Sequence, residues 1–128
     1  MLKRKAWERL EHWKRTDARK ALMITGARQI GKTTLVREFA KHHYRRFAEL
    51  NFLEDPRAAS VFDGSLSADA VISNLTAYLQ TQLEPGHTLI LLDEIQECPS
   101  ARTAIKFLVE DGRFDYVETG SLLGVKNK

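Results

Sequence analysis

Residues 26–33 read Gly26-Ala27-Arg28-Gln29-Ile30-Gly31-Lys32-Thr33 and match G-x-x-x-x-G-K-[ST] at every fixed position. A loop that wraps a phosphate must aim several backbone N–H groups inward, and the two glycines permit the angles and close approach that this requires. Lys32 adds positive charge for the β and γ oxygens and is a catalytic candidate, because it would neutralise the charge that develops during hydrolysis. Thr33 offers a hydroxyl to Mg²⁺. We therefore expect Gly26 through Thr33, together with Thr34, to bind the phosphates of ATP.

The segments around this loop alternate between strand and helix patterns. Short, largely apolar segments at 21–25, 88–92 and 114–119 predict strands, and so does 46–52, where Ala48, Leu50 and Phe52 fall on one face. Helical apolar spacing follows Lys32. It recurs after Ser67, and we expect Ser67 to cap a helix that ends before Pro85-Gly86. It recurs again after Ser100, and we expect Ser100 to cap a helix that ends at Gly112. This order predicts an α/β fold: a three-layer P-loop nucleotide-binding core whose mostly parallel sheet has about four strands.

The strand at 88–92 ends in Asp93-Glu94. Open α/β sheets bind ligands at the carboxyl ends of their strands, so Asp93 is expected to hold Mg²⁺ opposite Thr33. Glu94, one residue further, is expected to accept a proton from an attacking water. Taken alone, two acidic residues at a strand end are equally consistent with an exposed acidic pair on the protein surface. Beside a phosphate loop, adjacent acids favour an ATPase over a small-molecule kinase.

The strand at 114–119 runs into Thr119-Gly120-Ser121. A hydroxyl of Thr119 or Ser121 at this strand end would contact the hydrolytic water or the γ-phosphate, which makes both residues catalytic candidates. The same residues also fit a turn that satisfies its own backbone. Both interpretations stay open at this point.

Length and composition predict one ordinary globular domain over residues 1–128. The chain is 43% hydrophobic and 29% charged, with a net charge of +3. Cys98 is the only cysteine, which excludes an intrachain disulfide and a zinc site of several thiolates. No apolar run approaches the ~20 residues that span a bilayer, and no secretory signal follows the charged N-terminus. We therefore expect a cytoplasmic protein with no membrane partner.

Residues 1–18 are expected to form a basic amphipathic helix, because Leu2, Ala6, Leu10 and Trp13 fall on one stripe. Residues 1–20 hold eight Lys/Arg against three Asp/Glu, while the rest of the chain holds twelve against fourteen. This excess allows a nucleic-acid contact, although a solvated helix face is the simpler interpretation and the one we favour.

Three stretches together resemble prokaryotic AAA+-type ATPases. They are 22–34, with Gly-Ala-Arg-Gln; 91–99, with Asp-Glu-Ile-Gln; and 120–124, Gly-Ser-Leu-Leu-Gly. The chain looks similar to the archaeal-type group in which the ATPase domain precedes a C-terminal domain of unknown function. This resemblance implies a parallel sheet with the phosphate-loop strand at its centre, Mg·ATP as ligand and a polar sensor at Thr119 or Ser121. It also implies partners beyond ATP, either a second copy of the chain or the C-terminal domain.

ATPases of this group normally continue with a fifth strand and a helical lid, so we expect this chain to be the N-terminal part of a longer protein, truncated before both. The function expected is Mg·ATP binding and, in the complete protein, hydrolysis. The alternative is a nucleotide-dependent binding module with little turnover. A GTPase is disfavoured, because Asn127-Lys128 lacks the acid of the base-reading motif.

Overall fold

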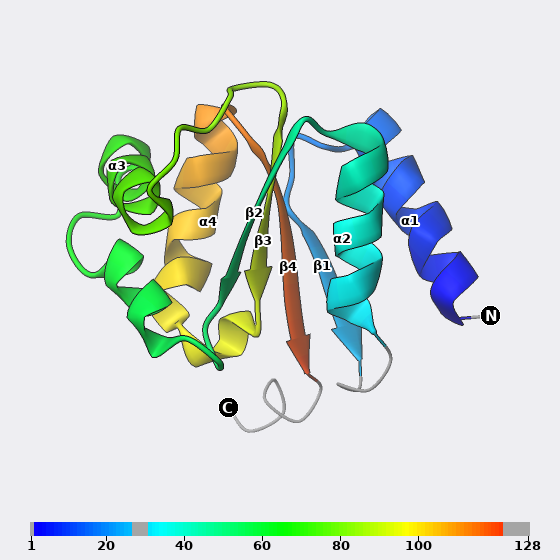
Figure 1. Ribbon diagram of the computed structural model, residues 1–128, viewed down its shortest axis with the longest axis horizontal. Helices are drawn as coiled ribbons and strands as arrows, with labels where there is room; N and C mark the ends of the chain where they lie inside the picture. Colours follow the sequence, from blue (N-terminus) through cyan, green and yellow to red (C-terminus); the bar gives the residue numbers. More distant parts are fainter. Residues whose placement is uncertain (1, 27–30, 122–128) are drawn as a thin grey trace.

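The computed structural model describes residues 2–26 and 31–121, with side chains for residues 4–26 and 31–120. Four parallel strands form one sheet in the order β1-β4-β3-β2, and their arrowheads lie at the same edge (Figure 1). The strands are β1 (Leu22–Gly26), β2 (Arg46–Asn51), β3 (Thr88–Asp93) and β4 (Asp115–Ser121). The helices are α1 (Leu2–Thr16), α2 (Lys32–His43), α3 (Ala68–Leu79) and α4 (Pro99–Asp111), with short 3-10 helices η2 (Pro56–Phe62) and η3 (Ile95–Glu97).

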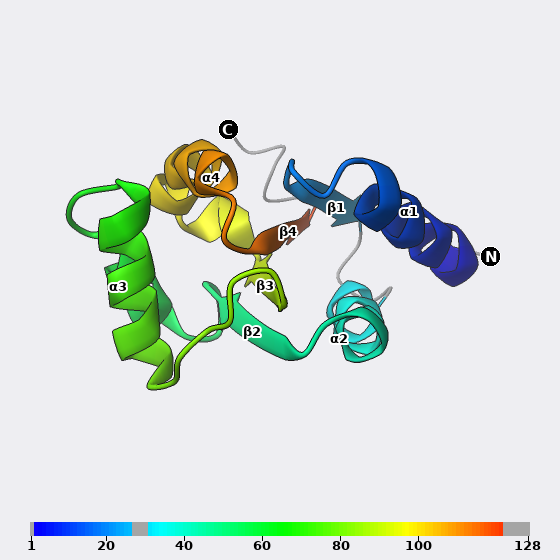
Figure 2. The same cartoon turned by 90° about the horizontal axis from the view of Figure 1, so that it is seen from above.

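Helices cover both faces of the sheet, which makes three layers (Figure 2). On one face α2 lies against the strands, and α1 packs beside it towards β1. On the other face lie α4, α3 and η2. Every residue of β3 is buried, because a central parallel strand is covered on both sides, and its four middle residues are accordingly apolar. The predicted α/β core is confirmed, and all of its strand pairs are parallel.

The side chains of each strand alternate between two apolar cores. Leu91 and Val117 belong to the core beneath α2, whereas Leu92 and Tyr116 belong to the core beneath α4. The parallel register sets Asn51 opposite Asp93, so the polar strand ends meet at one edge of the sheet. The backbone at the end of β1 pairs with the end of β4 there too. One corner of the molecule therefore gathers polar residues that are far apart in sequence.

The position of β1 corrects one expectation. The resemblance implied a central strand before the phosphate loop, but β1 pairs only with β4 and occupies an edge of the sheet that the structure describes. Sequence periodicity could not have settled this point, because apolar runs indicate burial and not neighbours. The outer side of β1 is partly covered by α1 and its following turn, and Leu22 is only half-buried.

The helix after Ser67 ends earlier than predicted. Ser67 does cap it, accepting a hydrogen bond from the Ala70 N–H at 3.3 Å. The helix stops at Leu79, six residues before Pro85, because Gln80 adopts a left-handed conformation with φ 58° and its N–H bonds back to the Thr76 carbonyl at 2.8 Å. Leu83 packs against the core from outside the helix.

We had expected Ser100 to cap the next helix, but it does not. The helix begins at Pro99, whose fixed φ suits a first helical position, and Cys98 is the cap residue without a side-chain hydrogen bond. Ser100 is therefore inside the first turn. Gly112 closes the helix as predicted, with φ 79°. The turn-rich stretch at 54–65 contains η2, whose start is capped by the Asp55 side chain.

The N-terminal helix α1 ends at Thr16, two residues before the predicted end at 18, and aromatic residues anchor it. Leu10 is fully buried and Trp13 nearly so, and the Trp13 Nε1–H donates to the Lys20 carbonyl at 2.7 Å. The Trp7 ring meets the edge of Phe39 on α2 at 5.4 Å between centroids. The apolar stripe of α1 is thus used for packing. Among the described helices, none is long and apolar enough to cross a bilayer.

Candidate functional site

The candidate site lies where β1, β3 and β4 end and α2 begins. Gly31 is the N-cap of α2 and has φ 72° and ψ 31°, in the left-handed region that favours glycine. A Cβ at Gly31 would meet no atom within 4 Å, so the backbone angle and not the space calls for glycine there. Gly26, at the end of β1, has φ 149°. Of the predicted phosphate-binding residues, Ala27, Arg28, Gln29 and Ile30 lie outside the described residues.

Asp93 is the centre of a hydrogen-bond network. Its Oδ2 accepts from the Thr33 hydroxyl at 2.7 Å and from the Asn51 side-chain amide at 3.2 Å, and its Oδ1 accepts from the Thr119 hydroxyl. Asp93 is 2% exposed and Thr119 is fully buried. The fold thus joins three predicted site residues from three separate elements, across 60 residues between Thr33 and Asp93.

Glu94 has an unusual backbone for a residue with a side chain. Its φ of 59° and ψ of 49° are left-handed, a conformation that costs energy outside glycine and recurs at functional sites. The Glu94 N–H donates to the Thr119 hydroxyl at 3.2 Å, and its carboxylate Oε1 accepts from the Gln96 side-chain amide at 2.8 Å. Thr119 therefore contacts both acidic residues at once.

Lys32 is nearly buried at the start of α2. Its ammonium donates to the Gly120 carbonyl at 2.8 Å and to the Gly26 carbonyl at 3.2 Å, and the side chain is 5% exposed. The two carbonyls belong to the paired ends of β4 and β1, so the sheet itself positions the charge. These contacts place the ammonium beside the loop that begins at Gly26.

Two predicted residues remain apart from this network. Thr34 is exposed, and within the described residues its side chain makes no hydrogen bond. Ser121 ends β4 with its backbone paired to Gly26, but its side chain lies outside the described part. Of the two candidate hydroxyls at this strand end, only that of Thr119 is placed, and it faces Asp93.

The sequence interpretation missed Asn51 and Gln96. Asn51 ends β2 directly opposite Asp93, and its side-chain oxygen also accepts from the Leu53 and Glu54 N–H groups at 3.0 and 2.9 Å. A polar residue at the end of an apolar strand was the available signal, the same one that singled out Asp93. Gln96 offered no signal except its place two residues after Glu94.

The donor set suits a hard divalent cation bound together with phosphates. Carboxylate and hydroxyl oxygens are the ligands that Mg²⁺ uses, and it takes one or two of them with waters and phosphate oxygens rather than a full protein cage. Within the described residues, no three His, Cys, Asp or Glu side chains gather into a metal cluster. Thr33 and Asp93 are the fitting pair, because their oxygens lie 2.7 Å apart beside the phosphate loop.

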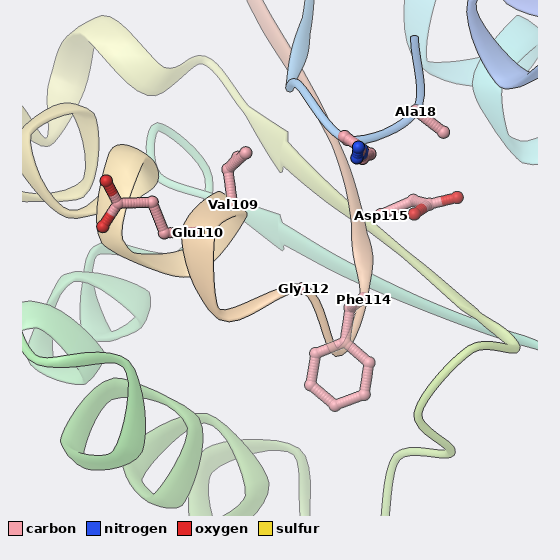
Figure 3. Close-up of a pocket in the computed structure, with 7 residues that line it drawn as sticks. Ala18, Val109, Glu110, Gly112, Phe114 and Asp115 are labelled. Atoms are coloured by element: carbon pink, nitrogen blue, oxygen red, sulfur yellow. The ribbon is translucent and has the colours of Figure 1, made fainter. Parts of the chain in front are cut away.

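A hollow of about 240 Å³ lies elsewhere (Figure 3). It is lined by the turn after α1, the end of α4 and the start of β4, including Ala18, Val109, Gly112 and Phe114. These residues are at the amino ends of the strands, opposite the edge that holds Asp93. None of the residues predicted to bind nucleotide lines it. The hollow is therefore separate from the candidate site.

Comparison with known proteins agrees with this geometry. A family model described as "AAA domain" matches residues 18–128. The solved structure titled "Structure of C. elegans PCH-2" is similar with a TM-score of 0.53 at 18% identity, covering 90% of this chain and 34% of that one. At this identity the similarity shows the fold alone, and this chain spans about a third of that protein's length. A search of curated proteins finds no match.

Proposed function

Because the chain belongs to the AAA-domain family, a family of nucleotide-binding, ATPase-like domains, we propose that it binds Mg·ATP and hydrolyses the β–γ phosphoanhydride bond. The observation that carries this proposal is the Thr33–Asp93–Thr119 network beside Lys32 and the phosphate loop. It brings the residue types of the two predicted motifs to one edge of the sheet.

Binding rests on the start of α2 and the loop before it. The N-terminal end of a helix attracts phosphate through its free N–H groups and its dipole. Lys32 would exchange its carbonyl contacts for the β and γ oxygens of the nucleotide. Thr33 and Asp93 would hold Mg²⁺, which when bound draws negative charge from the phosphate oxygens.

In the proposed hydrolysis, Glu94 is the general base, and the Thr119 hydroxyl positions the two acidic residues. Glu94 would accept a proton from water as the water oxygen bonds to the γ-phosphorus, and the bond to the bridging oxygen breaks with its electron pair leaving on ADP. Thr119 would hold Asp93 and the Glu94 backbone in fixed relation, since it contacts both.

A nucleotide-dependent binding module is the second candidate. The contact between Gln96 and the Glu94 carboxylate favours it, because a base that is already hydrogen-bonded is less ready to accept a proton. In this case ATP would be bound with slow turnover and would change a surface for a partner. Steady-state phosphate release at saturating ATP separates the two candidates.

The test uses two matched pairs of variants. Lys32→Ala is expected to abolish Mg·ATP binding by calorimetry, while Lys41→Ala, on the exposed side of the same helix, is expected to bind normally. Glu94→Gln is expected to bind and lose phosphate release, while exposed Glu97→Gln keeps it. Unchanged ATP binding by a folded Lys32→Ala protein would overturn the proposed site, and wild-type turnover by Glu94→Gln would overturn the assigned base.

A further inference from the structure

The turn and helix at the N-terminus carry a group of unpaired cations. We call the seven side chains the α1 basic surface: Arg4, Lys5, Arg9, Lys14, Arg15, Arg19 and Lys20. Six of them are exposed, and Lys14 lies over the Tyr44 ring at 4.3 Å from its centroid. Residues 4–20 hold these seven Lys/Arg against three Asp/Glu, and none of the seven makes an ion pair within the described part of the chain.

The arginines in the rest of the described chain behave differently, since each is within 4 Å of a carboxylate. The pairs are Arg37 with Glu49, Arg45 and Arg46 with Glu84, Arg57 with Asp55, Arg102 with Glu118, and Arg113 with Asp69 and Asp111. Among the arginines of the described residues, those without an ion pair therefore lie only on α1 and the turn after it. Their electrostatic field is directed to solvent and not used within the fold.

The opposite layer has the reverse charge. Residues 53–87 and 94–114, which contain η2, α3, η3 and α4, hold nine Asp/Glu against four Lys/Arg. An anionic polymer would therefore be attracted to the α1 side of the molecule and repelled from the far side. The asymmetry makes α1 the place where such a partner would bind.

The apolar stripe of α1 narrows the choice of partner. A basic amphipathic helix can bind an anionic membrane by inserting its apolar face. Here that face is already occupied, because Leu10 and Trp13 are buried and Trp7 packs on Phe39. An acidic peptide that binds through apolar anchors would find Leu10 and Trp13 of α1 already buried. The residues of α1 that remain exposed are mostly charged, with more cations than anions.

We propose that the α1 basic surface binds the phosphate backbone of nucleic acid without reading its sequence. The helix has 15 residues and is about 22 Å long, which spans roughly six successive phosphates of one DNA strand. Five of the seven residues of the surface precede the family match, which begins at residue 18. Binding through α1 therefore does not depend on ATP chemistry, and the proposal stands apart from the proposed function.

The experiment measures binding of the full chain to fluorescein-labelled duplex and single-stranded oligonucleotides of mixed sequence by anisotropy. If about four phosphates are neutralised, affinity for duplex is expected to fall roughly 100-fold between about 50 and 200 mM salt. Arg9→Gln with Arg15→Gln removes two exposed cations from the surface, and the expected loss at low salt is about tenfold, with a log–log salt slope smaller by about two.

The control removes the same charge from the opposite layer, by Arg57→Gln with Lys106→Gln, and is expected to bind as the wild type does. Thermal unfolding checks that both double variants are folded. No binding to either oligonucleotide at low salt overturns the proposal, and so does an equal loss in the control. Equally tight binding of polyglutamate, or binding to vesicles of anionic lipid, would also overturn it in favour of another partner.

Discussion

The side-chain amide of Gln96 donates a hydrogen bond of 2.8 Å to the carboxylate of Glu94, the residue we propose as general base. Glu94 precedes η3 in a left-handed conformation, and the turn that follows returns Gln96 to it within two residues. The contact restrains the group that must accept a proton. It thereby offers a simple way to hold hydrolysis low until the site rearranges.

Removing this contact should raise turnover. Gln96→Ala frees the Glu94 carboxylate from a hydrogen bond worth about 1 kcal/mol, so kcat is expected to rise up to about fivefold with little change in KM. Phosphate release at saturating ATP measures it, with exposed Gln82→Ala as the control. A fall in kcat would instead mean that Gln96 holds the base in its productive position.

Thr119 should matter to both stability and turnover. Thr119→Val keeps the shape but leaves the Glu94 N–H without its hydroxyl acceptor and Asp93 without one donor, in a buried position. We expect a loss of about 2 kcal/mol in the free energy of unfolding and a larger loss of kcat than of ATP affinity. Thr119→Ser should restore both, as denaturant titration and phosphate release would reveal. Normal turnover by the valine variant would remove Thr119 from the mechanism.

Replacing Gly31 by any residue with a side chain should lower the stability of the protein, because the backbone angle of Gly31 is left-handed. Gly31→Ala is expected to cost about 1–2 kcal/mol, since φ 72° is left-handed even though the surrounding space is open. Gly64→Ala is the matched control, because its surroundings are equally open and its φ is not in that region. Urea unfolding of the two variants compares them. Equal stabilities would show that the start of α2 relaxes to accept alanine.

Glu118 should make the protein less stable as the pH rises. Burial raises the pKa of its carboxyl above the ordinary 4.5, and the ion pair with Arg102 at 3.6 Å offsets this only in part. The folded state then binds the proton more tightly than the unfolded state, so its contribution is present below about pH 4.5 and is lost as the pH rises through the folded pKa.

Glu118→Gln tests this sign. The stability of the wild type relative to the variant should decline from pH 4 towards pH 7, as measured by urea unfolding at each pH. Exposed Gln82→Ala, which removes no titratable group, serves as the control. A wild-type advantage that grows with pH would mean that Arg102 outweighs burial.

Much of the candidate site could be predicted because its motifs are local. The glycine spacing and the lysine before Thr33 indicate a phosphate loop on their own, and Asp93 follows a run of apolar residues. The family resemblance agrees with the AAA-domain match, whereas membership in the group with a C-terminal domain of unknown function stays a prediction. The roles of Glu94, Lys32 and Thr33 are likewise predictions that the experiments above test.

The amino-acid order alone determined the alternation of strands and helices and the burial of β3, because hydrophobic periodicity and turn residues act over a few residues. Strand order, the edge position of β1 and the early end of α3 depended on tertiary packing, since they follow from which apolar faces meet. The contact between Asn51 and Asp93 also depended on tertiary packing. So did the position of the Thr119 hydroxyl, which the parallel sheet brings to Asp93. These contacts join residues far apart in the chain, and no local pattern encodes the distance between them.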